Sequence, residues 1–145
     1  MKYPKYPTLV DDAHARYQFF SDGPTGIVKK VISYERIHGN LFNLGFGDWN
    51  EELNDIDDSI RTNNGDRDQV LATVAGTAVD FTDKFPDALI YTEGSTPART
   101  RLYQMGISNN LEEISQDFEI EGHINKTWEL FRRGRNYDAF LAKRK

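Results

Sequence analysis

The strongest chemical signal in the chain is a tight turn that leads into a helix and carries two arginines, in the segment 94–101 (GSTPARTR). Thr96 is a favourable helix N-cap, and Pro97 suits the first helical position. The first turn of a helix leaves backbone N–H groups without intrahelical partners at the positive end of the helix dipole, which favours an anion. Arg99 and Arg101 place further positive charge there, although the dipole disfavours each cation by about 0.3–1 kcal/mol.

This segment has two interpretations, which the sequence alone leaves open. In the first, hydroxyl, backbone N–H and guanidinium groups bind a phosphate-bearing ligand, and the binding residues are Gly94, Ser95, Thr96, Arg99 and Arg101. In the second, Thr96 only caps the helix, and the arginines pair with Glu93 or with the acidic segment 48–58. No lysine follows the glycine turn, so the segment is not a Walker motif, and it is not a dinucleotide-binding fingerprint either.

A second pair of polar residues would complete such a site from the start of the preceding helix. Asp66 and Gln69 have capping-box spacing, and both Asp66 and Asp68 suit the positive end of the helix dipole. If both helices begin at the same edge of a sheet, these two carboxylates and the two arginines form one polar cluster. Helix capping without any ligand is the alternative interpretation of both aspartates.

Metal and cysteine chemistry have little support in the sequence. The chain has no cysteine, which excludes disulfides and thiolate ligands. His14, His38 and His123 share no metal-ligand spacing, and the acidic segment 48–58 lacks the glycine and the terminal glutamate of an EF-hand loop. We therefore assign no metal site, no cofactor and no catalytic residue.

The charge of the chain is unevenly distributed, which indicates an electrostatic partner. The net charge is −5, but residues 126–145 hold seven basic and two acidic residues. Arg132, Arg133 and Arg135 form a basic surface there, interleaved with aromatic residues as in proteins that bind single-stranded nucleic acid. The overall acidity argues against nucleic acid, and the asymmetry favours a protein partner or self-association. Solvated loops with a basic tail are the alternative.

Turn signals and hydrophobic periodicity divide the chain into strands and two helices. Apolar residues at spacings of three and four predict a helix over about 66–85, and Thr96 starts a second over about 97–116, which Gly106 or residues 108–110 could divide. The polar residues 47–65 predict the longest loop. Runs of β-branched and aromatic residues predict strands at 13–20, 27–37, 41–46, 88–91, 118–120, 127–131 and 137–142.

The order βββ-α-β-α-βββ predicts an α+β fold, in which a mostly antiparallel sheet of about six or seven strands packs against two helices on one face. We expect a single domain over 1–145, with an irregular N-terminus at 1–12 and a basic end at 143–145. No stretch approaches the roughly 18 apolar residues of a membrane span, and the N-terminus lacks a signal peptide. A soluble, cytoplasmic protein with no membrane partner is therefore expected.

Five segments distributed along the chain carry a family resemblance: SDGPTGIVKKV (21–31), NLGFGDW (43–49), NNGDRDQVLATVA (63–75), EGSTPARTRLYQM (93–105) and NYDAFLAKRK (136–145). Together they resemble a family of small bacterial proteins of about this length whose function is uncharacterised. The resemblance covers most of the chain and implies a bacterial origin. It implies no activity, and no site residue can be carried over from it.

The sequence leaves three classes of function open and favours a non-enzymatic one. The leading hypothesis is a protein-interaction or accessory module, similar to an antitoxin, that binds its partner through a charge-polarised surface. The alternative is a sensor of phosphate-bearing or nucleotide ligands built on residues 94–101. The third is an enzyme that processes phosphodiesters or nucleotides, with Arg99, Arg101, Asp66, Asp68 and His38 as its candidate residues.

Overall fold

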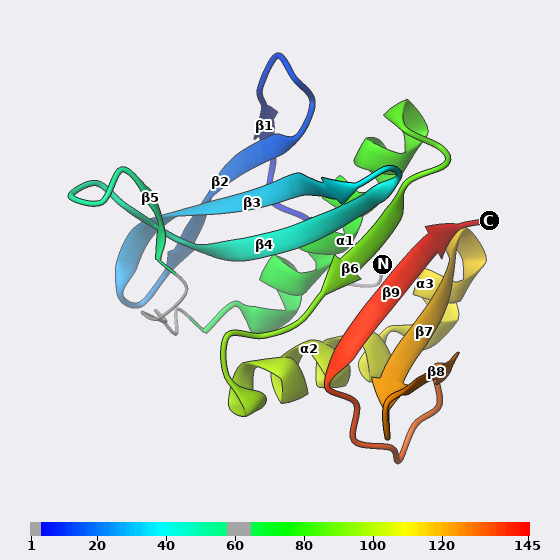
Figure 1. The fold of residues 1–145 in the computed structure, drawn as a ribbon. Coiled ribbons are helices and arrows are strands. Elements are labelled where there is room, and N and C mark those ends of the chain that lie inside the picture. The colour runs from blue at the N-terminus through cyan, green and yellow to red at the C-terminus, as the bar shows by residue number, and fades with distance from the viewer. Residues whose placement is uncertain (1–3, 58–64) are drawn as a thin grey trace.

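Nine strands and three helices make up the regular structure of residues 4–57 and 65–145, which are the residues that the computed structural model describes (Figure 1). The helices are α1 (Arg67–Lys84), α2 (Pro97–Asn109) and α3 (Leu111–Asp117). None of these helices is long and apolar enough to cross a membrane. The strands are β1 (Leu9–Val10), β2 (Arg16–Gly23), β3 (Gly26–His38), β4 (Leu41–Asn50), β5 (Asp55–Asp57), β6 (Leu89–Thr92), β7 (Phe118–Ile124), β8 (Thr127–Leu130) and β9 (Ala139–Arg144).

All nine strands belong to one sheet with the order β1-β2-β3-β4-β6-β9-β7-β8, and β5 pairs with the end of β4. Within the described residues, β4 and β6 form the one parallel pair, because α1 crosses over between them. The other pairings are antiparallel. The α+β class and the mostly antiparallel sheet are confirmed, but the prediction of six or seven strands is too low.

Two strands lie in segments for which the sequence predicts none. β1 adds a short edge strand inside the expected irregular N-terminus. β4 continues to Asn50, and β5 folds back on it inside the acidic segment. The prediction of a loop over 47–65 is therefore wrong at the end of β4 and at β5. Residues 58–64 of the predicted loop lie outside the described part of the chain. The acidic composition conceals the alternation around Ile56, which pairs with Trp49 in the sheet.

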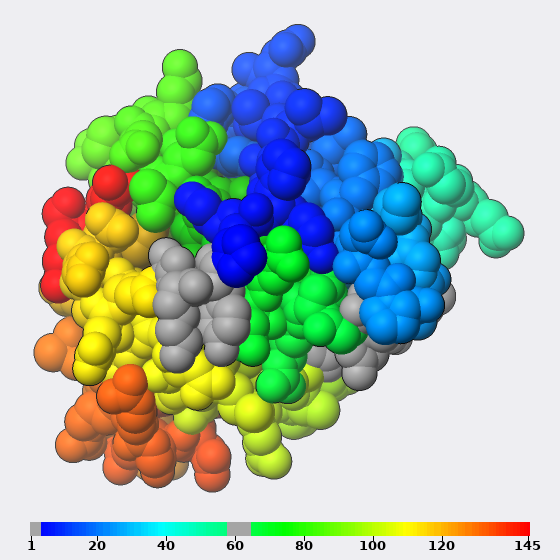
Figure 2. Space-filling view, turned by 180° about the vertical axis from the view of Figure 1, so that it is seen from behind, coloured from blue at the N-terminus to red at the C-terminus, as the bar shows by residue number. Residues whose placement is uncertain are grey.

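The helices cover one face of the sheet, as Figure 1 shows from the open side and Figure 2 from the helix side. α1 agrees with the helix expected at about 66–85. The second expected helix, 97–116, is instead two helices that separate at Asn110. Asn110 has φ −123° and ψ 19°, and its Nδ2 donates a hydrogen bond of 2.8 Å to Gly106 O. A side chain that bonds to nearby backbone in this way competes with continuation of the helix.

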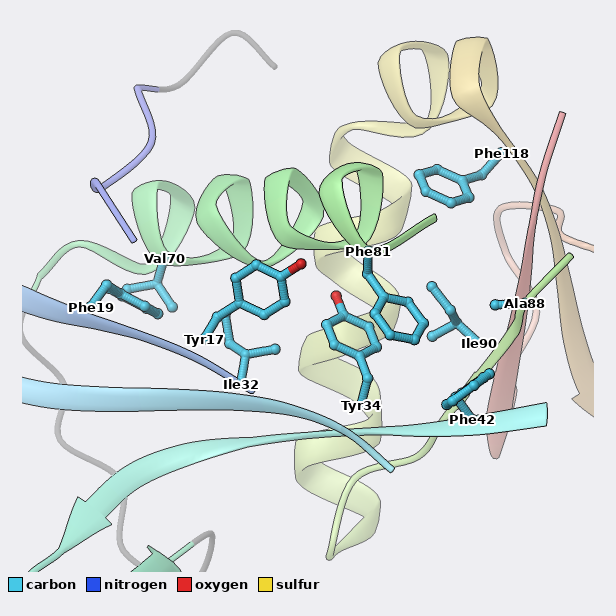
Figure 3. Packing of buried hydrophobic residues seen from close by; sticks show 10 residues of the cluster. All are labelled: Tyr17, Phe19, Ile32, Tyr34, Phe42, Val70, Phe81, Ala88, Ile90 and Phe118. Atoms are coloured by element: carbon cyan, nitrogen blue, oxygen red, sulfur yellow. The ribbon is translucent and has the colours of Figure 1, made fainter. Parts of the chain in front are cut away.

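Aromatic side chains dominate the core between α1 and strands β2, β3 and β4 (Figure 3). Phe81 is fully buried, stacks on Tyr34 with 4.3 Å between ring centroids, and meets Phe42 edge-on at 5.0 Å. Full burial of a side chain such as Phe81 contributes about 1.5–3 kcal/mol. The buried Tyr34 hydroxyl bonds to Thr77 Oγ1 at 2.9 Å, so its polar atom is satisfied. These contacts fix α1 across the first half of the sheet.

A second cluster fixes α2 over the other half of the sheet. Phe131, Tyr137 and Phe140 form its centre, and Tyr103 and Ile107 of α2 pack against them. α1 and α2 are thus each anchored to a different part of the sheet by a different aromatic cluster. The separation of these two anchors determines how much space lies between α1 and the α2–α3 pair.

Candidate functional site

The start of α2 adopts the capped turn that its sequence predicts. Thr96 is the N-cap, with φ −139° and ψ 159°, and its Oγ1 accepts a hydrogen bond of 3.2 Å from Arg99 N–H. Pro97 occupies the first helical position and has no N–H. Of the first three helical residues, Ala98 is therefore the one whose backbone N–H remains for an outside acceptor.

Gly94 is held in close contact with the first turn of α2. Its N–H donates to Thr100 Oγ1 at 2.9 Å, and that hydroxyl donates in turn to Thr96 O at 3.2 Å. A Cβ on Gly94 would lie 2.3 Å from Thr100 N, which is far too close for any side chain. Gly94 and Thr96 therefore have structural roles in the turn, and Ser95 is exposed beside them.

Arg99 and Arg101 carry positive charge that no carboxylate in the described ranges balances. Arg99 is half-buried and Arg101 is exposed. The ion pairs of residues 4–57 and 65–145 include neither guanidinium, so the alternative in which the arginines pair with Glu93 or with the acidic segment is not found among these residues. An anion bound at Gly94–Arg101 stays a prediction, which rests on these two charges and the Ala98 N–H.

Asp66 anchors the N-terminal segment of the protein to α1. Its Oδ2 accepts hydrogen bonds of 2.5 Å from the Tyr6 hydroxyl and from Ser21 Oγ. Tyr6 N–H donates to Thr73 Oγ1 at 2.9 Å, so the N-terminal segment, blue in Figure 2, lies against α1, green in the same view. The carboxylate of Asp66 is therefore occupied by partners that the sequence does not indicate, and it makes no side-chain cap of α1.

The predicted polar cluster of two aspartates and two arginines is not joined by direct contacts. Asp68 is half-buried in the first turn of α1. Within the described part of the chain, no hydrogen bond or ion pair links Asp66 or Asp68 to Arg99 or Arg101. The aspartates belong to the start of α1 and the arginines to the start of α2, each with its own surroundings.

The predicted basic surface is tied to the fold by its own partners. Arg135 forms a two-pronged pair with Glu129 at 2.9 and 3.1 Å, and Arg132 lies 3.5 Å from the same carboxylate. Arg133 donates to a backbone carbonyl of α2 at 2.8 Å. The Tyr137 hydroxyl also donates to Glu129, and this bond, with the arginines, holds the pKa of Glu129 below its usual range. The arginines therefore stabilise the turn before β9.

Two histidines form pairs with aspartates at separate places. His14 Nε2 lies 2.7 Å from Asp80, and His123 Nδ1 lies 2.6 Å from Asp138. The Tyr17 hydroxyl also donates to Asp80, at 2.6 Å, and lowers the pKa of that carboxyl together with His14. In the described ranges, no group of three or more histidine or acidic side chains has the geometry to hold a metal ion.

A cavity of about 760 Å³ lies between the helices and the sheet. Its floor is formed by large side chains of β4, β6, β7 and β9, namely Leu44, Phe46, Ile90, Phe118 and Phe140. Val74 and Ala75 of α1 border one side, and Ile107 of α2 and Ile114 of α3 border the other. The cavity thus has a mostly apolar lining, is partly open to solvent, and is bordered by elements from distant parts of the sequence.

Small residues on α1 and the course of the helices account for this space. α1 and α2 come close together at Gly106, where a Cβ would lie 2.7 Å from Leu71 Cδ1. From there the cavity extends along α1 as far as Asp83 and along α3 as far as Asp117. Protein interiors contain few voids larger than a water molecule. Here the side chain of Ala75 is too short to fill the space between the helices, so a cavity remains.

Family membership follows from a match over nearly the whole sequence. A model of DUF6934, a family of unknown function, matches residues 2–145. This chain belongs to the DUF6934 family. No curated protein and no solved structure matches it. The resemblance to an uncharacterised family is confirmed, and DUF6934 membership assigns no ligand to the start of α2 or to the cavity.

The cavity is the feature of this DUF6934 protein that sequence reasoning missed. The small residues Ala72, Ala75 and Gly76 of α1 all line the cavity. Lys5 lies over Gly76, where a Cβ would come within 2.6 Å of its Cδ. A run of small residues opposite large aromatic residues was the available signal, but it does not distinguish a close contact from an open space.

Proposed function

We propose that this DUF6934 protein is a non-enzymatic binding protein that holds a small apolar molecule in the cavity between α1, α2 and α3. The observation that carries the proposal is the cavity itself. Its volume of about 760 Å³ falls within the roughly 300–1,000 Å³ of small-molecule sites. Apolar walls with a few polar groups are also the composition typical of such sites.

An apolar space of this size favours a ligand on physical grounds. Water inside it finds few hydrogen-bond partners, because apolar walls offer none. A ligand that shields the walls from water gains about 25 cal/mol per Å² of apolar surface. The aromatic floor, anchored by the same contacts that fix the helices, provides a rigid surface for such a ligand.

The proposal keeps a ligand-binding function but locates it away from the start of α2. Thr92 lines the cavity, whereas no residue of the described segment 94–101 does. A phosphate or nucleotide would lose its hydration against apolar walls, so it does not suit this space. The phosphate sensor and the nucleotide-processing enzyme stay predictions that depend on Arg99 and Arg101.

The test is saturable binding of N-phenyl-1-naphthylamine, an uncharged fluorophore whose emission rises in apolar surroundings. We expect binding to wild type, and we expect Ala75→Phe to weaken it by at least about tenfold, because the new ring occupies the cavity. Ala98→Phe adds the same ring at an exposed position that is not part of the cavity lining, and it should bind like wild type.

Circular dichroism and thermal unfolding establish that both variants are folded. Equal binding by Ala75→Phe and wild type would show that the fluorophore binds elsewhere. Either that result or a lack of saturable binding by wild type would overturn the proposal.

Self-association is a second candidate function, favoured by the open face of the sheet. Phe20, Trp128 and Leu130 are 50%, 38% and 62% exposed. Side chains alternate between the two faces of a strand, and Phe19 lies in the core on the helix side, so Phe20 lies on the open side. Trp128 is opposite His123, and Leu130 is two residues further along the same face.

The charges of this face suit a second copy of the chain. Arg16 and Lys29 lie beside Trp49 at one end, and Glu119 and Glu121 lie on β7 at the other. A twofold axis would place the basic end of one copy over the acidic end of the next. We expect a concentration-dependent dimer in light scattering that Phe20→Ser/Leu130→Ser abolishes, and a monomer at all concentrations would contradict this role.

A further inference from the structure

The two ends of the cavity differ in how deeply they are buried. At one end, Ala72 has no exposed surface and Gly106 is buried between α1 and α2. At the other end, the side chains of Asp80 and Asp83 are 52% and 61% exposed, and Asp117 is exposed as well. All five residues line the cavity. The cavity is therefore closed at the Gly106 end and meets solvent at the Asp83 end.

The same two ends differ in polarity. The closed end is lined by apolar side chains, with Leu71 and Ala72 from α1 and Ile107 from α2. At the open end, Asp83 pairs with Arg144 at 2.8 Å, and this ion pair joins α1 to the end of β9. A molecule that fills the cavity would thus contact only apolar groups at its inner end, and charged groups and water at its outer end.

The distance between the two ends limits the length of a ligand. The lining residues of α1 extend from Leu71 to Asp83. At a rise of about 1.5 Å per residue this span is about 18 Å, which is the length of an extended hydrocarbon chain of about 14 carbons. The floor of the cavity presents the apolar side chains of Phe46, Ile90 and Phe118 to such a chain. The space therefore suits one long chain that lies along α1.

From these features we infer that the ligand of the cavity is a single-chain amphiphile, an unbranched hydrocarbon tail that carries a polar head group. The inference rests on the proposed function, because it names the chemical class of the molecule in the same cavity. The tail lies toward Leu71 and Gly106, where its burial removes the most apolar surface from water. The head group lies beside Asp83 and Arg144, where it keeps its hydrogen bonds, whereas the reverse orientation would bury it without partners.

A series of unbranched alcohols tests the length of the tail. Radiolabelled n-alkanols from octanol to octadecanol are measured with the wild-type protein by equilibrium dialysis, each below its solubility limit. Each further carbon that becomes buried should strengthen binding about fourfold. The gain should stop near about 14 carbons, because the tail then fills the cavity as far as its closed end.

Substitutions at the two ends test the direction of the tail. Leu71→Ala enlarges the closed end and should move the limit to chains about two carbons longer, whereas Leu71→Phe fills that end and should shorten the limit. Gln116→Ala changes an exposed residue at the open end and should leave the limit unchanged. Leu102→Ala is the matched control, because Leu102 is a half-buried leucine of α2 outside the cavity lining, and it should bind like wild type. Thermal unfolding establishes that each variant is folded.

The outcomes distinguish the inference from the function on which it rests. The single-chain ligand is the wrong class if affinity for wild type does not depend on chain length. The orientation is wrong if Gln116→Ala moves the limit and neither Leu71 variant does, or if Leu102→Ala moves it as far as Leu71→Ala. In each of these cases fluorophore binding still supports the cavity as a site. If neither the fluorophore nor any alkanol binds, the proposed function itself fails.

Discussion

The start of α2 and the cavity differ in two respects. They differ in how many polar groups are already hydrogen-bonded within the chain, and in how much space the side chains leave unfilled. At the start of α2, threonine hydroxyls bond the backbone N–H groups of Gly94 and Arg99, and no Cβ fits on Gly94. Around the cavity, α1 and α3 border an open space, and Asn110 has a buried oxygen without a partner in the described chain. At the start of α2, the Ala98 N–H and the two arginine charges are the groups that remain for a ligand, whereas the cavity offers open volume and apolar surface.

The two regions also differ in the kind of attraction that they offer. Arg99 and Arg101 provide charge near the surface, where salt and water weaken the interaction. The cavity offers apolar surface, which salt does not screen. The comparison therefore predicts that substitutions at the start of α2 change stability more than those at the cavity wall, where neighbours can move into open space.

Gly94→Ala should be the most destabilising of these changes. The new Cβ would lie 2.3 Å from the backbone of Thr100, which cannot move without displacing the first turn of α2. We expect a loss of about 3 kcal/mol in the free energy of unfolding, measured by urea denaturation.

Gly45→Ala is the matched control for Gly94→Ala. Its Cβ would meet Asn43 Nδ2 at 4.0 Å, which is ordinary contact, and it should lose less than about 1 kcal/mol. Equal losses in the two variants would show that close packing is not what requires glycine at Gly94.

The parts of the structure that depend on neighbouring residues could be predicted from the sequence. Thr96 and Pro97 mark the start of α2 because a threonine hydroxyl caps a helix and proline, which has no N–H, suits the first helical position. The apolar periodicity of α1 and the alternation of strand-forming runs with turn residues are also local patterns, and they predict the α+β class. These signals lie within a few residues of the element that they determine.

The parts that depend on distant residues could not be predicted. Asp66 is bonded by Tyr6 and Ser21, which are 60 and 45 residues away in sequence. The cavity depends on how far apart α1 and α3 lie on the sheet, and no local pattern records that distance. The break at Asn110 is intermediate, since residues 108–110 indicated a division but not the hydrogen bond to Gly106 that accompanies it.

Thr96→Ala should have a smaller effect than Gly94→Ala. It removes the oxygen that accepts the Arg99 N–H and should cost about 1 kcal/mol, the usual value for an N-cap. Thr96→Ser keeps this oxygen and should retain most of the stability in the same urea measurement. If the alanine and serine variants are equally stable, the cap does not hold the start of α2.

Asp80→Asn should change the acid stability at the edge of the cavity. The Tyr17 hydroxyl and His14 lower the pKa of Asp80, so its contribution is present above the unfolded-state pKa near 4 and is lost as the pH falls through the folded-state pKa. The cost at pH 7 should stay below about 1 kcal/mol, because the side chain is half exposed and screened. Urea unfolding at pH 7 and pH 3 should show the variant approaching wild type at the lower pH, and a constant difference would contradict this.

Gly106→Ala should have the smallest effect, although its clash resembles that of Gly94→Ala. The new Cβ would lie 2.7 Å from Leu71 Cδ1, but Leu71 lines the cavity and its side chain has open volume to move into. Alanine inside a helix is also favoured over glycine by about 1 kcal/mol, which offsets the adjustment. We expect the free energy of unfolding to stay within about 0.5 kcal/mol of wild type. A loss as large as that of Gly94→Ala would mean that the space beside Leu71 is already filled, and the cavity would then lose its place as the candidate site.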